Sequence, residues 1–208
     1  MSSLAQPLHV WIFNDASIVS LLRADSPLWP DTIPGLLVEL STRPVLAHAL
    51  DLETPPAYPG LVGLLGPTTA PADLVIRLPD LPFPAILSPA QPAAAASAIA
   101  AVRRLRTESR IFGPRILLID ASLVPDILPA LAAADRVGIA WDLSTPPGPQ
   151  LQSLLSALAG ENLLRPATWA GLLGYLSPDH QATDEERVAA ATSLAALPSA
   201  RLLPALAA

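Results

Sequence analysis

The 208-residue chain contains no lysine and no cysteine, so each of its 12 basic side chains is an arginine. Without lysine, the chain cannot supply the lysine of a phosphate-binding P-loop or form a Schiff base. Without cysteine, it has no thiolate nucleophile, no disulfide and no sulfur ligand for zinc or an iron–sulfur cluster. Any chemistry therefore depends on carboxylates, hydroxyls, histidines and backbone dipoles.

Aromatic and charged side chains are also scarce, at 4% and 14% of the chain, whereas charged residues make up about 25% of an average protein. Hydrophobic residues reach 51%, which argues against a disordered chain. The 25 prolines predict that the secondary-structure elements are short. A net charge of -6 makes a nucleic acid an unlikely partner.

Neither a secretory signal nor a membrane span is expected. The first residues, MSSLAQPLHVWIF, lack the charged segment and the continuous apolar segment of a signal peptide. The longest run of small apolar residues, 93–102, is far shorter than the about 20 residues that a spanning helix needs. We therefore expect a cytoplasmic protein.

Short runs of valine, isoleucine, leucine and phenylalanine recur along the first 141 residues, with helical patterns between some of them. This alternation predicts an α/β fold: a mixed, mostly parallel sheet with flanking helices, Rossmann-like or flavodoxin-like. The gaps 65–74 and 78–85 are too short for a crossover helix, so part of the sheet should be antiparallel or irregular. The expected strands are 8–13, 36–40, 61–65, 74–78, 85–87, 115–119 and 137–141, and the expected helices are 16–23, 92–106 and 123–134.

A proline-rich break at 145–149 separates two regions of different character. We expect residues 1–146 to form the α/β sheet domain and residues 147–208 to form a helical extension. Thr183 and Glu186 have the spacing of a capping box, which predicts a helix start there. The helices expected in the extension are 150–159, 167–176, 184–197 and 199–207.

The sequence Asp-Ala-Ser follows two of the predicted strands, and these corners hold the best candidate site residues. Ligands of open α/β sheets bind outside the carboxyl ends of the strands, where the amides of the next helix can hold an anion. Asp15, Asp120 and Ser122 are the candidate catalytic residues, and Ser17 is a candidate ligand-binding residue. Structural capping of the following helices is the preferred interpretation of all four.

Arg103, Arg104 and Arg106 lie in the one basic segment of the chain and are further candidate ligand-binding residues. The planar guanidinium group suits phosphate or carboxylate. The simpler interpretation is that these arginines complement the negative carboxyl end of the predicted helix 92–106.

No motif predicts a metal or a cofactor, and none is expected. His9, His48 and His180 are too scattered for a zinc site. The chain also lacks a glycine-rich dinucleotide motif and the Gly-x-Ser-x-Gly turn of a serine hydrolase.

The missing catalytic set and the alanine- and leucine-rich tail favour a non-catalytic protein-binding or assembly module, with a protein partner or self-association. The alternative is a small enzyme or ligand-binding domain that acts on an anionic metabolite, phosphorylated or carboxylated, at the carboxyl ends of the strands. In that alternative Asp15 and Asp120 serve as acid, base or magnesium ligands. A third hypothesis is contact with nucleic acid through the arginine cluster. Whether the chain is an enzyme stays open at this point.

Overall fold

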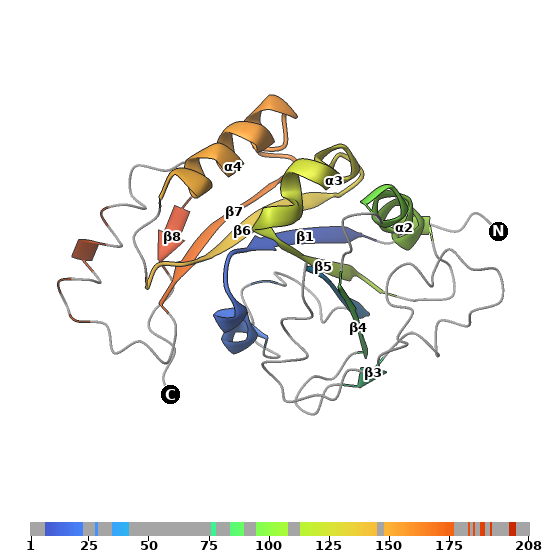
Figure 1. Cartoon of the computed structure of the whole chain (residues 1–208), viewed down its shortest axis with the longest axis horizontal. Coiled ribbons are helices and arrows are strands. Elements are labelled where there is room, and N and C mark those ends of the chain that lie inside the picture. The colour runs from blue at the N-terminus through green and yellow to red at the C-terminus, as the bar shows by residue number, and fades with distance from the viewer. Residues whose placement is uncertain are drawn as a thin grey trace.

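A computed structural model describes residues 7–22, 28, 35–41, 76–77, 84–89, 95–107, 113–144, 148–176, 183, 185, 188–189, 192 and 200–202. In these residues the strands form a single sheet in the order β3-β4-β2-β5-β1-β6-β7-β8 (Figure 1). The strands are β1 (Leu8–Phe13), β2 (Leu36–Ser41), β3 (Ile76–Arg77), β4 (Pro84–Pro89), β5 (Arg115–Asp120), β6 (Arg136–Asp142), β7 (Trp169–Tyr175) and β8 (Ala200–Leu202).

The sheet is parallel except at one end, where β3 pairs antiparallel with β4. Parallel neighbours need a crossover connection, and α2 (Ala95–Thr107), α3 (Val124–Leu131) and α4 (Pro149–Gly160) precede β5, β6 and β7 in the chain. The gap before β4 is too short for a crossover, which accounts for the antiparallel pair. The predicted mixed, mostly parallel α/β fold is therefore confirmed.

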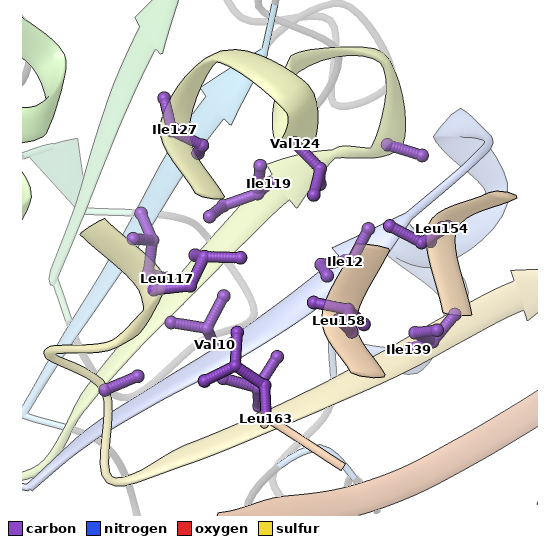
Figure 2. Packing of buried hydrophobic residues seen from close by; sticks show 14 of the residues in the cluster. Val10, Ile12, Leu117, Ile119, Val124, Ile127, Ile139, Leu154, Leu158 and Leu163 are labelled. Carbon is purple, nitrogen blue, oxygen red and sulfur yellow. The ribbon is translucent and has the colours of Figure 1, made fainter. Parts of the chain in front are cut away.

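The main core lies between the sheet and the layer formed by α2, α3 and α4 (Figure 1). Alternate residues of β1, β2, β5 and β6 point toward these helices, and Figure 2 shows Ile12 of β1 close to Leu158 of α4. Both side chains are fully buried. Burying one such side chain stabilises the fold by about 1.5–3 kcal/mol, so this layer holds β5, β1 and β6 in a fixed arrangement.

On the other face of the sheet, Trp11 of β1 lies across Gly138 of β6. A β-carbon placed on Gly138 would stand 2.4 Å from the Trp11 ring, so this position requires glycine. The indole Nε1 of Trp11 donates a 2.6 Å hydrogen bond to the carbonyl of Leu28. This hydrogen bond holds the indole in place over Gly138. We call the whole pairing of β1 with β6 the β1–β6 seam.

The carboxyl-terminal region differs from the expectation. Residues 167–176 were predicted to be a helix, but 169–175 form β7, which pairs with β6, and β8 pairs with β7 within the predicted helix 199–207. A purely helical extension after residue 146 is therefore wrong, because strands on both sides of that boundary share one sheet. Six of the seven β7 residues are buried, and a strand buried on both faces lacks the alternating pattern that distinguishes strands from helices.

Other predicted elements agree with the structure in part. The expected helix 16–23 is a short 3-10 helix, η1 (Ala16–Leu21), and α2, α3 and α4 occupy the other predicted helical segments before residue 161. The predicted strand 61–65 and the Glu186 half of the capping box lie outside the described residues. Residues 185, 188, 189 and 192 are helical. Within the described part of the chain, none of the helices combines the length and the apolar character needed to cross a bilayer.

Candidate functional site at the carboxyl edge of the sheet

Polar side chains gather where four neighbouring strands end. We call this the carboxyl edge: the ends of β5, β1, β6 and β7 with the residues that follow them. β5 ends at Asp120, β6 at Asp142 and β7 at Tyr175, and Asn14 follows β1. In the order of the sheet these four strands are adjacent, so their ends lie side by side.

Three of these strand ends carry the same turn. The Oδ1 atoms of Asp15, Asp120 and Asp142 each accept a 2.8 Å hydrogen bond from the backbone amide of the serine two residues later, at Ser17, Ser122 and Ser144. We call each one an Asp-x-Ser corner. The first two corners cap short 3-10 helices, η1 and η5 (Ala121–Leu123), as expected of aspartate before a helix.

The corners of β1 and β5 lie at the same edge, on hydrogen-bonded strands. Phe13 and Asp120 are partners in the parallel register, and Asp15 follows Phe13 by two residues. The Asp15 side chain is exposed and that of Asp120 is partly exposed. Within the described residues, the Oδ2 atom of each aspartate has no hydrogen-bond partner. Both carboxylates can therefore meet a ligand from solvent.

The third corner is different, because Asp142 is only 7% exposed and both of its carboxylate oxygens are bound. Oδ1 also accepts from the Ser144 hydroxyl at 2.6 Å, and Oδ2 accepts from the Ser17 hydroxyl at 3.1 Å. Asn14 bonds to the Asp142 backbone through both ends of its amide, at 2.8 Å and 3.3 Å. Asp142 thus joins β6 to the corner that follows β1.

Tyr175 closes this network from β7. Its hydroxyl lies 3.5 Å from the Ser17 hydroxyl, and its side chain is buried. Burial is the main cause that raises the pKa of the Tyr175 phenol. The hydrogen bond with Ser17 lowers this pKa by a smaller amount, and the negative charges of Asp142 and Asp15 raise it again. The phenol therefore stays neutral near pH 7.

Sequence reasoning missed Asn14, Asp142, Ser144 and Tyr175. A usable signal existed for two of them, since Asp142 and Ser144 repeat the spacing of the Asp-Ala-Ser corners directly after a predicted strand. The middle residue of that corner is leucine instead of alanine, so its sequence differs from the Asp-Ala-Ser triplet. No such signal marked Tyr175, because it lies in the segment 167–176, which is expected to be a helix and not a strand of the sheet.

The candidate arginines do not join the carboxyl edge. Arg106 donates to the carbonyl of Ala133 at 2.6 Å and to the Asp135 carboxylate at 2.7 Å, just before β6 begins. Arg103 and Arg104 are exposed in the last turns of the same helix, α2. These side chains lie toward the amino ends of the strands, away from Asp15 and Asp120.

The donor set at the carboxyl edge suits a hard divalent cation only in part. Within the described residues, no three histidine or acidic side chains stand close enough to hold a metal ion by themselves. Magnesium commonly takes only one or two carboxylates and completes its shell with water and the phosphates of a nucleotide. Asp15 and Asp120 supply the two carboxylates that the second arrangement uses, from the ends of adjacent strands.

A search of family models gives no match, and neither does a search of curated proteins. Solved structures do match. One is cobyrinic acid a,c-diamide synthase from Mycobacterium smegmatis with bound ATP analog and magnesium, at TM-score 0.66 and 16% identity over 95% of this chain and 84% of that one. Another is a ParA family ATPase from Chlorobium tepidum, at TM-score 0.58 and 16% identity over 96% and 84%. A third is the MinC:MinD cell division complex from Aquifex aeolicus, at TM-score 0.51 and 10% identity over 80% and 68%.

These matches show that the chain shares the α/β fold of these proteins, consistent with the Rossmann-like prediction. They contradict the hypothesis of a non-catalytic protein-binding or assembly module, because the similar structures include a ParA family ATPase and a synthase with a bound ATP analog. The sequence favoured a non-catalytic module because no complete set of catalytic residues could be recognised in it and because its tail is rich in alanine and leucine.

A lysine-and-glycine phosphate loop does not fit this chain. The chain has no lysine, and no glycine lies between Phe13 and the end of η1. The Ser17 amide, where a helix start would hold a phosphate, already donates to Asp15. A phosphate at this edge therefore needs a cation to offset the carboxylates.

Proposed function

We propose that the chain is a nucleotide-binding domain that takes its ligand as the magnesium complex at the carboxyl edge of the sheet. The observation that carries the proposal is the pair of solvent-facing carboxylates, Asp15 and Asp120, at the ends of adjacent parallel strands. Open α/β sheets bind ligands at this edge, and the similar synthase holds an ATP analog and magnesium. This extends the alternative hypothesis of an anionic, phosphorylated ligand.

In this proposal magnesium takes over the charge that lysine supplies elsewhere. A bare triphosphate would be repelled by the two carboxylates, whereas a divalent cation attracts both the carboxylates and the phosphate oxygens. When bound, the cation would offset the negative charge of the phosphates. Asp15 and Asp120 would hold it through Oδ2, while their Oδ1 atoms keep the turns in place.

Asp142 would not take part in metal binding, because its two oxygens already accept three hydrogen bonds. Ser122 is exposed next to Asp120 and is placed to contact the ligand or its water shell. The arginines of α2 have no part in this proposal because they lie toward the amino ends of the strands.

Equilibrium dialysis or calorimetry with ATP tests the proposal. We expect binding to the full chain with magnesium and none with a chelator. Asp15→Asn and Asp120→Asn keep the capping oxygen and remove the charge, so each should weaken binding about tenfold without unfolding the protein.

Glu161→Gln is the matched control for the loss of one negative charge. Glu161 is exposed at the carboxyl end of α4, next to the turn that leads into β7. It should leave ATP binding unchanged. Equal binding with and without magnesium, or no effect of the two aspartate variants, would refute the proposal.

We also propose a cytoplasmic location and a protein partner or self-association. The MinC:MinD structure supports the second point, since it is a complex of a protein with the same fold. Light scattering of the full chain with and without magnesium and ATP tests it. A monomer under both conditions would argue against self-association.

A further inference from the structure

We propose that Asp142 is a positioning residue that orients the Asp15 corner. This inference rests on the proposed function insofar as Asp15 is taken to hold magnesium. Asp15 is exposed, but Asn14 and Ser17 on either side of it both bond to Asp142. The corner is therefore attached to β6 at two points that flank the proposed metal ligand.

The first attachment extends the β1–β6 seam beyond the last strand residue. The Asp142 amide donates to Asn14 Oδ1 at 2.8 Å, and Asn14 Nδ2 donates to the Asp142 carbonyl at 3.3 Å. A side-chain amide thus continues the strand pairing where the backbone of β1 turns away. This contact uses only backbone atoms of Asp142, so it does not depend on the side chain at that position.

The second attachment does depend on the Asp142 side chain. The Ser17 hydroxyl donates to Oδ2 at 3.1 Å, and the Ser144 amide and hydroxyl hold Oδ1 at 2.8 Å and 2.6 Å. Rotation of the carboxylate away from Ser17 would break these bonds as well. The carboxylate is therefore held in the orientation that receives Ser17.

The Asp15 corner needs this support because its own helix is weak. η1 has six residues in 3-10 geometry, which is less stable than an α-helix and is not expected to hold its start rigidly. Tyr175 adds a contact to the same Ser17 hydroxyl from β7. Without these contacts, the bond from the Ser17 amide to Asp15 would be the main local restraint on the Asp15 side chain.

The Asp120 corner provides an internal control. It has the same turn, with the Ser122 amide 2.8 Å from Asp120 Oδ1, but none of its hydrogen bonds in the described residues reaches Asp142. A change at Asp142 that acts only on overall stability should affect both corners. A change that acts by positioning should affect the Asp15 corner alone.

Amide hydrogen exchange, resolved at Ser17 and Ser122 by NMR, tests this without any ligand. In Asp142→Ala we expect exchange at Ser17 to rise about tenfold, the effect of losing one hydrogen bond to a charged group, while Ser122 stays unchanged. Asp142→Asn should restore slow exchange at Ser17, since an amide can still bond to both hydroxyls.

Ser17→Ala tests the same point if Asp142→Ala does not fold. It removes the attachment and leaves the Asp142 carboxylate bonded to Ser144, so exchange at residue 17 should again rise while Ser122 stays unchanged. Equal acceleration at both corners, or no acceleration at residue 17, would overturn the inference.

Binding of magnesium-ATP then separates this inference from the proposed function. If the unmodified chain binds, Asp142→Ala should weaken binding about tenfold and Asp142→Asn by less than about threefold. If it does not bind, the proposed function fails, and the exchange results alone decide whether Asp142 positions the corner. A loss of binding in Asp142→Asn as large as in Asp142→Ala would contradict positioning through hydrogen bonds.

Discussion

The two ends of the β1–β6 seam are joined in the same way but with different charge balance. At the amino end, the Asp135 carboxylate accepts from the Leu8 amide at 2.9 Å and from Arg106 at 2.7 Å. At the carboxyl end, Asp142 accepts from the Ser17 and Ser144 hydroxyls and the Ser144 amide. One aspartate forms hydrogen bonds across each end of the seam, Asp135 at the amino end and Asp142 at the carboxyl end. Of these two, only Asp135 has a cationic partner in the described residues.

The two ends of the sheet therefore differ in how their negative charge is balanced. The amino end pairs its charge with Arg106, as a purely structural contact would. At the carboxyl edge, Asp15 and Asp120 face solvent without a hydrogen-bonded cation in the described part of the chain. Carboxylate oxygens that face solvent can bind a cation, which is the arrangement that the proposed function uses.

Gly138→Ala should have the largest effect on stability, because Gly138 pairs with Trp11 in the middle of the β1–β6 seam. The new β-carbon would stand 2.4 Å from the buried Trp11 ring, and relief requires movement of the indole. We expect a loss of about 3 kcal/mol in the free energy of unfolding, measured by urea denaturation. A loss below about 1 kcal/mol would mean that the seam tolerates displacement of Trp11.

Asp142→Ala and Asp135→Ala compare the two ends directly. Asp142 is buried, so its removal leaves the Ser17 and Ser144 hydroxyls without their acceptor and should cost about 2–3 kcal/mol of stability. Asp135 is 38% exposed, and water can replace it, so about 1 kcal/mol is expected. The urea midpoints of the two variants measure the difference, and the reverse order would contradict this interpretation.

Tyr175→Phe should alter stability in alkaline solution. The folded pKa of Tyr175 is raised above the ordinary value of 10.0, so the unfolded chain loses its phenol proton first as the pH rises. The folded form then binds more protons than the unfolded form, and stability falls above pH 10 by at most about 1.4 kcal/mol per pH unit. Urea unfolding between pH 9 and 11 should show that the free energy of unfolding declines less steeply with pH in the phenylalanine variant. An equal decline would mean that a group other than Tyr175 causes it.

The smallest effect concerns the Arg106–Asp135 ion pair. Its side chains are 35% and 38% exposed, so a double-mutant cycle should give a coupling of about 0.5–1 kcal/mol that decreases with added salt. The cycle combines Arg106→Ala with Asp135→Ala and is read from denaturation midpoints. A coupling that does not respond to salt would show that the contact is shielded from solvent.

Much of the sheet could be predicted from the sequence, because β1, β2, β5 and β6 are compact apolar runs with clear boundaries. β7 could not, since alanine, leucine and glycine without alternation fit a helix as well as a buried strand. The Asp-Ala-Ser corners were found at the correct strand ends. The network around Asp142 could not be predicted, because Ser17 and Tyr175 are 158 residues apart in the chain. They come together only because β1, β6 and β7 are neighbours in the sheet.

The row of Asp-x-Ser corners has a consequence for how the two ends of the sheet respond to ions. Neighbouring strands are about 4.8 Å apart, so the ends of β5 and β1, and those of β1 and β6, bring aspartates within about one screening length of the next. Dissolved ions relieve that mutual repulsion, while they weaken the attraction between Arg106 and Asp135. Raising the ionic strength should thus stabilise the carboxyl edge of the sheet and weaken the Arg106–Asp135 ion pair at the opposite edge.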